Sequence, residues 1–270
     1  MKNRFHAICH SQYCIRLCSI IFCLCSVFGL SARTLRFAQI SDTHIRPNHS
    51  TISDLSRSVR QINAMDSVDF VILTGDITHK GDKESLMLAK ALLDSLIIPY
   101  YIIPGNHDTK FGTQCINDFI DVFGAENFLL GHSDIVFVGL NTGQLGVSEG
   151  SVSAENMLWL DSVLQTIPDE KVKFLVTHHP IQEGDITNWQ ELGDLIVKYK
   201  IDYILSGHYH INMLFDCFGI PDVITRTNQS NEVRCSGFSL ITISGDTIMW
   251  EECCPDGVKN IWLELPFVKK

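Results

Sequence analysis

Residues 70–76 read FVILTGD, a short run of apolar and β-branched residues that ends in Gly75 and Asp76. Such a run, closed by a turn signal, is typical of a buried β-strand. The same arrangement, a strand followed at once by Asp, Asn or His, recurs along the chain. Because loops beyond the carboxyl ends of strands converge at one edge of an α/β sheet, the recurrence predicts a shared polar site there.

Short strands alternate with helices from residue 34 onward, and this alternation predicts an α/β fold. Strands are expected at residues 34–40, 70–74, 100–103, 135–140, 172–177 and 203–206. Helices are expected at residues 52–65, 83–96, 114–123, 154–165 and 189–199. After residue 210 the pattern changes to strands separated by turns, at residues 211–218, 232–243, 246–253 and 260–265. This last part is expected to be mainly antiparallel.

Five polar clusters each follow an expected strand directly. They are Asp42-Thr43-His44, Gly75-Asp76, Gly105-Asn106-His107-Asp108, His178-His179-Pro180 and Gly207-His208-Tyr209-His210. Carboxylate, amide and imidazole ligands together suit divalent first-row transition metals. The set is too large for one ion and about right for two, so the pattern predicts a dinuclear metal site.

The order of these clusters resembles that of the calcineurin-like metallophosphoesterase family, whose motifs are D-x-H, G-D, G-N-H-[D/E], H and G-H-x-H. All five motifs are present without substitution, over about residues 35–212. The resemblance implies a four-layer α/β/β/α sandwich, with two central mixed β-sheets flanked by helices. A single domain over residues 33–270 is expected.

The resemblance also implies which side chains bind metal. The implied ligands are Asp42, His44 and His210 for one ion, Asn106, His178 and His208 for the other, and Asp76 as a bridge between them. The cofactors would be two divalent transition-metal ions, Mn, Fe or Zn. Ligand types alone leave the identity of the metal open.

Two further residues of the third motif receive catalytic roles from the same resemblance. His107 is the candidate general acid, or a stabiliser of transition-state charge, near the leaving-group oxygen. Asp108 is expected to orient or tune the imidazole of His107. His178 is preferred to His179 as the ligand, because the family's ligand commonly precedes a variable residue and then a proline. His79 is expected at the surface or behind the ligands.

The sequence around the bridging carboxylate favours a diesterase. Residues 75–82, GDITHKGD, resemble the bacterial branch of the family near cyclic-nucleotide phosphodiesterases. His79 stands where purple acid phosphatases carry an iron-binding tyrosine. Lys80, Lys83 and Lys110 follow motifs after which protein serine/threonine phosphatases carry arginines. The expected substrate is therefore a small-molecule, nucleotide or lipid-headgroup phosphodiester.

Two alternative functions stay open at this point. One is a phosphomonoesterase of the nucleotidase type, and the other is a non-catalytic binding protein of the cell envelope. The second is disfavoured because all the implied ligands and His107 are present. Residues that could line the cleft and set specificity are Phe111, Asn141, Trp189 and Tyr209.

The charge balance bears on partners and on location. Thirty-one acidic against 21 basic residues give a net charge of −10, which disfavours binding of a nucleic-acid duplex through a broad basic surface. Residues 1–32 hold three basic residues, no acidic one and the apolar run 17–28, a pattern typical of a signal peptide. An extracytoplasmic location is therefore expected, without a membrane span in the mature chain. Oligomeric state is left open, and a lipid anchor is not favoured.

Five of the ten cysteines lie after the expected signal peptide, at positions 115, 217, 235, 253 and 254. An exported protein could form disulfides among the last four. Cys253 and Cys254 are adjacent and are not expected to bridge each other. The odd number leaves at least one thiol outside any bridge within the chain.

Overall fold

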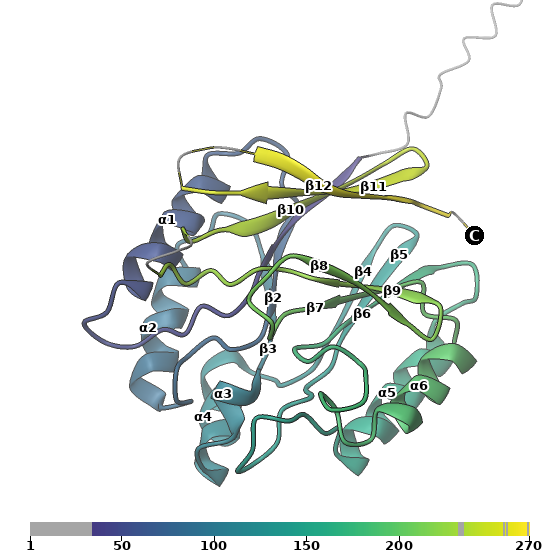
Figure 1. The fold of residues 1–270 in the computed structure, drawn as a ribbon, viewed down its shortest axis with the longest axis horizontal. Coiled ribbons are helices and arrows are strands. Elements are labelled where there is room, and N and C mark those ends of the chain that lie inside the picture. Colours follow the sequence, from purple (N-terminus) through teal and green to yellow (C-terminus); the bar gives the residue numbers. More distant parts are fainter. Residues whose placement is uncertain (1–33, 232–234, 256, 258, 269) are drawn as a thin grey trace, which may run out of the picture. The chain divides into compact units, whose positions relative to one another are not determined.

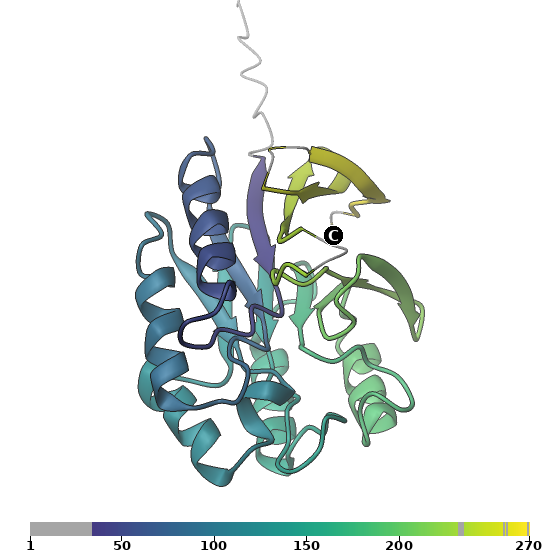
Figure 2. The ribbon, with the colours of Figure 1, turned by 60° about the vertical axis from the view of Figure 1, so that its left-hand side comes forward.

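Two six-stranded β-sheets lie face to face, and helices cover the outer side of each (Figures 1 and 2). The computed structural model describes residues 34–231, 235–255, 257, 259–268 and 270. The expected signal peptide at residues 1–32 lies outside the described residues. The four-layer α/β/β/α arrangement expected from the sequence is thus confirmed.

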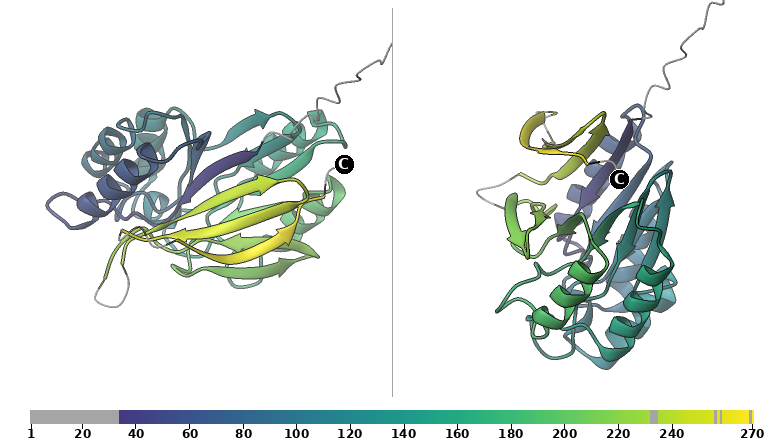
Figure 3. Two further views of the ribbon diagram at one scale, coloured as in Figure 1. Left: turned by 90° about the horizontal axis from the view of Figure 1, so that it is seen from above. Right: turned by 90° about the vertical axis from the view of Figure 1, so that its right-hand side faces the viewer.

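The first sheet has the strand order β12-β11-β10-β1-β2-β3. Its strands are β1 (Leu35–Ile40), β2 (Phe70–Thr74), β3 (Tyr100–Ile103), β10 (Phe238–Ser244), β11 (Thr247–Cys253) and β12 (Lys259–Pro266). The first three run parallel to one another, whereas β10, β11 and β12 form an antiparallel extension (Figure 3). The extension joins the sheet through β1, where Leu35 lies opposite Ile243.

The second sheet has the strand order β4-β5-β6-β7-β9-β8. Its strands are β4 (Phe128–His132), β5 (Ile135–Gly139), β6 (Val172–Val176), β7 (Tyr203–Ser206), β8 (Met213–Cys217) and β9 (Ile220–Ile224). The four central strands run parallel, and antiparallel strands close both edges.

Three apolar cores hold the four layers together. Between the sheets, Phe37 and Phe70 pack with Phe137 and Phe174, which come from the facing sheet. Outside the first sheet, a second core joins its strands to α1 (Thr51–Asn63), α2 (Lys83–Leu93) and α4 (Thr113–Phe123). Outside the second sheet, a third core joins its strands to α5 (Ala154–Thr166) and α6 (Trp189–Lys198).

The observed elements agree with the expected ones except at a few places. The strand expected at residues 232–243 is observed as β10, which begins at Phe238, and residues 232–234 lie outside the described residues. The sequence pattern misses β4, in which half-buried and exposed residues alternate, and β9, which contains Pro221. It also misses the four-residue helix α3 (Asn106–Thr109). Helix α2 ends at Leu93, before the expected residue 96, because the chain turns there with a bond from the Leu96 N–H to the Leu93 carbonyl. In the C-terminal part, β9 pairs in parallel with β7, which the antiparallel expectation did not include.

The carboxyl ends of the parallel strands of both sheets carry the polar clusters. β1, β2 and β3 of the first sheet end just before the first three clusters, and β6 and β7 of the second sheet end just before the last two. This edge is where ligands bind in open α/β sheets. Among the described residues, no helix combines the length and apolarity that crossing a bilayer requires.

Candidate metal centre

A first group of ligand-type side chains joins Asp42, His44, Asp76 and His210. One donor atom of each lies within 4.8 Å of the others. Nε2 of His44 lies 3.7 Å from Oδ2 of Asp76 and 3.2 Å from Nε2 of His210. Nε2 of His210 lies 3.1 Å from Oδ1 of Asp42. Two carboxylates and two imidazoles at these distances are a donor set for a divalent transition metal.

A second group joins His178 and His208 with Asn106 and His179. Donor atoms of the three rings lie within 4.8 Å of one another. Nε2 of His178 lies 3.0 Å from Oδ1 of Asn106. His178 and Asn106 are buried. The structure therefore brings together the three residues that the family resemblance assigned to a second ion.

Asp76 lies between the two groups and presents a different oxygen to each. Its Oδ2 faces His44 at 3.7 Å, and its Oδ1 faces Nε2 of His178 at 3.3 Å. Oδ1 also accepts a hydrogen bond from the backbone N–H of His107 at 2.7 Å. A carboxylate in this position can bind one ion through each oxygen.

Hydrogen bonding around His178 shows that the second group suits a cation. Nδ1 of His178 donates to the carbonyl of Thr74 at 2.8 Å, since a carbonyl oxygen can only accept. Burial lowers the pKa of His178 to about 3, so the ring is neutral near pH 7 and Nε2 carries a lone pair. This lone pair faces the acceptor oxygens of Asn106 and Asp76. Three acceptors aimed at one another repel unless a metal cation or a proton lies among them.

The carboxyl groups of Asp42 and Asp76 have pKa values shifted in opposite directions. Burial, together with the charges of Asp42 and Asp108, raises the pKa of Asp76 well above its usual range. Burial acts to raise the pKa of Asp42 as well, but the hydrogen bond to His210 and the neighbouring histidines lower it overall. Burial lowers the pKa of His44 to about 3. A bound divalent cation would offset the repulsion between the two carboxylates.

Strained backbone is concentrated at the predicted ligands. Five of them have positive φ angles, namely Asp42 (53°), His44 (45°), Asp76 (51°), His208 (67°) and His210 (58°). Positive φ is uncommon for residues other than glycine and costs about 1–3 kcal/mol each. Strain of this kind persists only where the surrounding structure holds it, and it is typical of functional sites.

Two motif glycines are required by the ligands that pack against them. Gly75 has a φ of 90°, and a Cβ there would lie 2.6 Å from Nδ1 of His178. A Cβ on Gly207 would collide with Oγ of Ser41 and lie 2.9 Å from Oδ2 of Asp42. Each glycine therefore lets a ligand from the opposite sheet approach the backbone closely.

His107 lies on α3, the short helix that also carries Asn106. Its Nδ1 donates to the carbonyl of His79 at 2.8 Å, and its Nε2 lies 3.1 Å from the ammonium of Lys110. Lys110 also donates to Oγ of Ser148 at 2.9 Å. Burial lowers the pKa of His107, so Nε2 accepts the proton that Lys110 offers. The sequence reasoning gave Lys110 no role, although its spacing three residues after His107 is a helical contact distance.

The contacts of Asp108 are with backbone N–H groups and one hydroxyl. Its carboxylate accepts hydrogen bonds from the backbone N–H groups of Gly105, Ile77 and Thr78 and from the Thr78 hydroxyl, at 2.7–2.9 Å. The His79 carbonyl, and not Asp108, contacts Nδ1 of His107, so an effect of Asp108 on that imidazole stays a prediction. Asp108 joins the loop after β2 to the loop after β3.

His179 is a buried neighbour of the ligands. Its Nδ1 lies 2.8 Å from Oγ1 of Thr142, and its Nε2 lies 3.0 Å from the carbonyl of Ser148. Both ring nitrogens thus have partners within the protein, and the choice of His178 as the ligand stays a prediction. Burial lowers the pKa of His179 well below its usual range.

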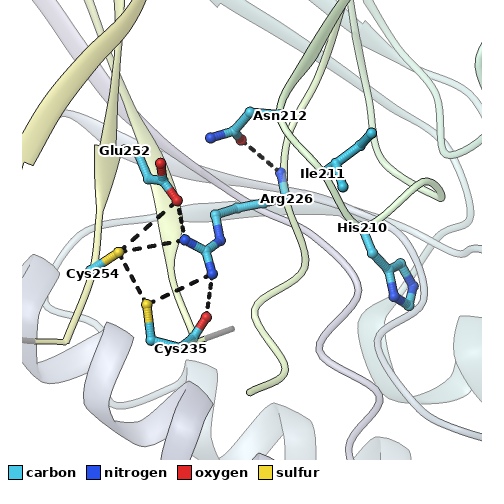
Figure 4. A pocket seen from close by; sticks show the side chains of 7 residues that line it. All are labelled: His210, Ile211, Asn212, Arg226, Cys235, Glu252 and Cys254. Carbon is cyan, nitrogen blue, oxygen red and sulfur yellow. Dashed lines mark hydrogen bonds and ion pairs between the residues drawn. The ribbon is translucent and has the colours of Figure 1, made fainter. Parts of the chain in front are cut away.

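A cavity of about 470 Å³ opens beside His210. Figure 4 shows its lining, which consists of His210, Ile211, Asn212, Arg226, Cys235, Glu252 and Cys254. Of the expected cleft residues, Phe111 lies 5.8 Å from the His107 ring and Tyr209 lies 5.8 Å from the His208 ring, measured between centroids. Trp189 and Asn141 line two other pockets, so the expectation for them is not supported.

Comparison with known proteins places this geometry in a family. The family model of the calcineurin-like phosphoesterases matches residues 35–212, which include every predicted ligand. The chain belongs to the calcineurin-like phosphoesterase family. Because enzymes of this family hydrolyse phosphoesters, the protein is a phosphoester hydrolase with a site suited to divalent metals.

Relatives within the calcineurin-like phosphoesterases include several proteins named as phosphodiesterases. A protein of Arcobacter nitrofigilis named "Probable glycerophosphodiester phosphodiesterase" is 34% identical over 192 residues, which cover 64% of this chain and 70% of that protein. The 3',5'-cyclic adenosine monophosphate phosphodiesterase of Escherichia coli is 23% identical over 78% of this chain and 82% of its own length. Among solved structures, a dimetal phosphatase from Danio rerio has a TM-score of 0.66 at 13% identity and covers 87% of this chain and 99% of its own. That likeness shows a similar fold and nothing more.

Proposed function

We propose that this calcineurin-like phosphoesterase is a phosphodiesterase that uses two divalent cations. The observation that carries the proposal is the position of Asp76, which directs one oxygen to the His44 group and the other to the His178 group. The names of the relatives support a diester as substrate, because both sequence relatives described above are named as phosphodiesterases. A small-molecule diester is the substrate class that agrees with a cavity of about 470 Å³ beside His210.

Two sets of side chains would hold the cations. Asp42, His44, Asp76 and His210 form the first set, and Asp76, Asn106, His178 and His208 form the second. When bound, the cations supply Lewis-acid activation of the phosphoryl oxygens and of the attacking water. Mn, Fe and Zn all fit carboxylate, amide and imidazole donors, so the identity of the metal is a matter for measurement.

The protein's own residues would manage the proton of the leaving group. The His79 carbonyl fixes Nδ1 of His107, and this contact leaves Nε2 as the atom that exchanges protons. Lys110 donates to Nε2 at 3.1 Å, so the pair holds a proton that can pass to a departing alkoxide. A p-nitrophenolate leaves without such help, whereas an alkoxide needs it.

Hydrolysis of bis-p-nitrophenyl phosphate tests the proposal directly. The purified protein is loaded with Mn, Zn or Fe, its metal content is measured, and the rate is compared with that on p-nitrophenyl phosphate. We expect metal-dependent turnover that prefers the diester and about two metal ions per chain. Asp76→Asn should lower the rate at least about 1,000-fold and reduce the metal content, because it removes the shared carboxylate.

His107→Ala provides the matched control for the proton-transfer step. The variant should keep its metals and lose more activity on alkyl phosphodiesters than on the nitrophenyl ester, typically about 100-fold or more. Faster turnover of the monoester than of the diester by the loaded protein would contradict the assignment as a diesterase. A single metal ion per active chain would contradict the dinuclear centre.

A further inference from the structure

Two thiols lie in contact on the wall of the cavity beside His210. Sγ of Cys235 lies 3.2 Å from Sγ of Cys254, and both cysteines are in the free thiol form. A disulfide bond is about 2.0 Å long, so closing it needs a movement of about 1 Å. Figure 4 shows the two sulfur atoms pointing toward each other, with the guanidinium of Arg226 beside them.

The backbone brings these two cysteines together at the end of a strand pair. The last register pair of β10 and β11 is Phe238 with Cys253. Cys235 lies three residues before that pair and Cys254 lies one residue after it, so they face each other just beyond the ladder. The side chain of Cys253 is buried in the core under the first sheet. The structure therefore distinguishes Cys254 from its neighbour Cys253, which the sequence could not do.

Polar contacts hold both sulfurs in place. The Arg226 guanidinium donates to Sγ of Cys254 at 3.4 Å and to Sγ of Cys235 at 3.8 Å. It also donates to the backbone carbonyl of Cys235 and pairs with the carboxylate of Glu252. Arg226 itself is buried, with 7% of its surface exposed. For Cys254, the charge of Arg226 acts to lower the pKa of the thiol, against the larger effects of burial and of the hydrogen bond from Cys235.

We propose that Cys235 and Cys254 are a modification site at which a disulfide forms by exchange with a low-molecular-weight disulfide. Cys235 is exposed and reacts first. Its thiolate attacks one sulfur of the oxidant, which gives a mixed disulfide and releases one small thiol. The thiolate of Cys254 then attacks Sγ of Cys235 and releases the second small thiol. Two cysteine thiols are oxidised to one disulfide, and one oxidant molecule is reduced to two thiols that take up both protons.

The accessibility of the two thiols gives the order of these steps. Cys254 is half-buried, and burial together with the hydrogen bond from Cys235 raises its pKa to about 11. Cys254 therefore reacts slowly with a reagent in solution and rapidly with a sulfur held 3.2 Å away. The product would join the segment before β10 to the end of β11 and fix the cavity wall that carries Arg226 opposite His210.

Peptide mapping of the full-length protein tests the proposal. The protein is treated with oxidised or reduced glutathione, blocked with iodoacetamide under denaturing conditions, and digested. Trypsin leaves both thiols on one peptide, residues 235–259, so a second cleavage after Glu252 is needed. We expect oxidised glutathione to link the peptide that contains Cys235 to the peptide 253–259. The mass of the linked pair should be 2 Da below the summed mass of the two peptides with free thiols. The oxidised protein should melt about 5 °C higher than the reduced one.

Two variants decide which cysteine is involved. Cys254→Ala should abolish the link and leave glutathione attached to Cys235. Cys253→Ala should keep the link, because its sulfur lies in the core and not at the cavity. Independent alkylation of both thiols after oxidation would overturn the proposal. A link that persists in Cys254→Ala, or a mixed disulfide that never closes in the unmodified sequence, would overturn it equally.

Discussion

The two sheets supply different chemistry to the same centre. Loops after the first sheet contribute both carboxylates of the centre, Asp42 and Asp76, together with His44 and Asn106, whereas loops after the second sheet contribute imidazoles alone, namely His178, His208 and His210. The backbone N–H groups of Ile77 and His107 donate to Asp108 and Asp76, and ring nitrogens from the facing sheet lie 3.1–3.3 Å from Asp42 and Asp76. The negative charge of the site is therefore anchored on one half of the molecule and matched by neutral donors from the other half. Neither half forms the site alone.

Asp222, a buried carboxylate of the second sheet, differs from the carboxylates that the first sheet supplies to the metal centre. Asp222 lies on β9 and accepts hydrogen bonds from the Ser206 hydroxyl at 2.5 Å and from the N–H of Ile181 at 3.4 Å. Burial raises its pKa to about 7, from 3.8 in an unfolded chain. Its contribution to stability is complete below pH 3.8 and is lost as the pH rises through 7.

Asp222→Asn removes this titration. Between pH 4 and pH 8, the free energy of unfolding of the variant should rise relative to that of the unmodified protein by up to about 4 kcal/mol. Urea titrations of both metal-free proteins at each pH measure the difference, and the histidines common to both cancel. A difference that stays constant with pH would show that Asp222 ionises normally in the folded protein.

Gly75→Ala disturbs the close contact between Gly75, after a strand of the first sheet, and His178, after a strand of the second. The new methyl group would lie 2.6 Å from Nδ1 of His178, at a φ of 90°. We expect a loss of about 3 kcal/mol in the free energy of unfolding, together with weaker metal binding. Gly184→Ala is the matched control, since it has a φ of 89° and nothing within 4 Å of the added carbon. That variant should lose about 1 kcal/mol and keep its metals.

Asp108→Asn tests the anchoring of the first-sheet loops. An amide cannot accept all of the hydrogen bonds from Gly105, Ile77 and Thr78, so we expect a loss of about 2 kcal/mol in stability measured by denaturant. The metal-loaded variant should retain the same preference among leaving groups as the unmodified protein. A change in preference like that of His107→Ala would support the view that Asp108 tunes that imidazole.

Lys110→Met is expected to have the smallest effect. Removal of the ammonium that contacts Nε2 of His107 should lower kcat/KM about tenfold on alkyl phosphodiesters and less on the nitrophenyl ester, because it weakens only proton delivery. Lys90→Met, which breaks a helical ion pair with Asp94 on the surface, is the control and should leave the rate unchanged. Equal losses on both substrates would argue for a role of Lys110 in binding.

Features of the fold and site that depend on neighbouring residues could be predicted from the sequence. That the polar clusters meet at one edge could be predicted because each follows an apolar strand, and strand direction places them there, whereas the assignment of individual ligands came from the family resemblance. The contacts of Asp108 could not be read, because its partners Ile77 and Thr78 are about thirty residues away and no local pattern marks them. The same holds for the pairing of Cys235 with Cys254, which depends on the register of β10 and β11.

Some secondary structure was missed for equally physical reasons. Strand β9 contains Pro221, which resembles a turn in sequence, yet in the structure β9 lies between β7 and β8. Helix α3 is only four residues long, too short for a helical period to show. Its form depends on the bond from the Gly105 N–H to the Asp108 carboxylate, within a network that includes the loop after β2.

The position of β1 in the first sheet has a consequence for biosynthesis. β1 is a central strand, and one of its two neighbours, β10, is made about two hundred residues later, with Leu35 opposite Ile243. During synthesis, one edge of β1 therefore stays unpaired until about two hundred further residues have been made. Such long-range pairing makes folding slow and leaves an apolar edge open to aggregation. A nascent chain released before residue 238 would lack this neighbour altogether and should depend on chaperones.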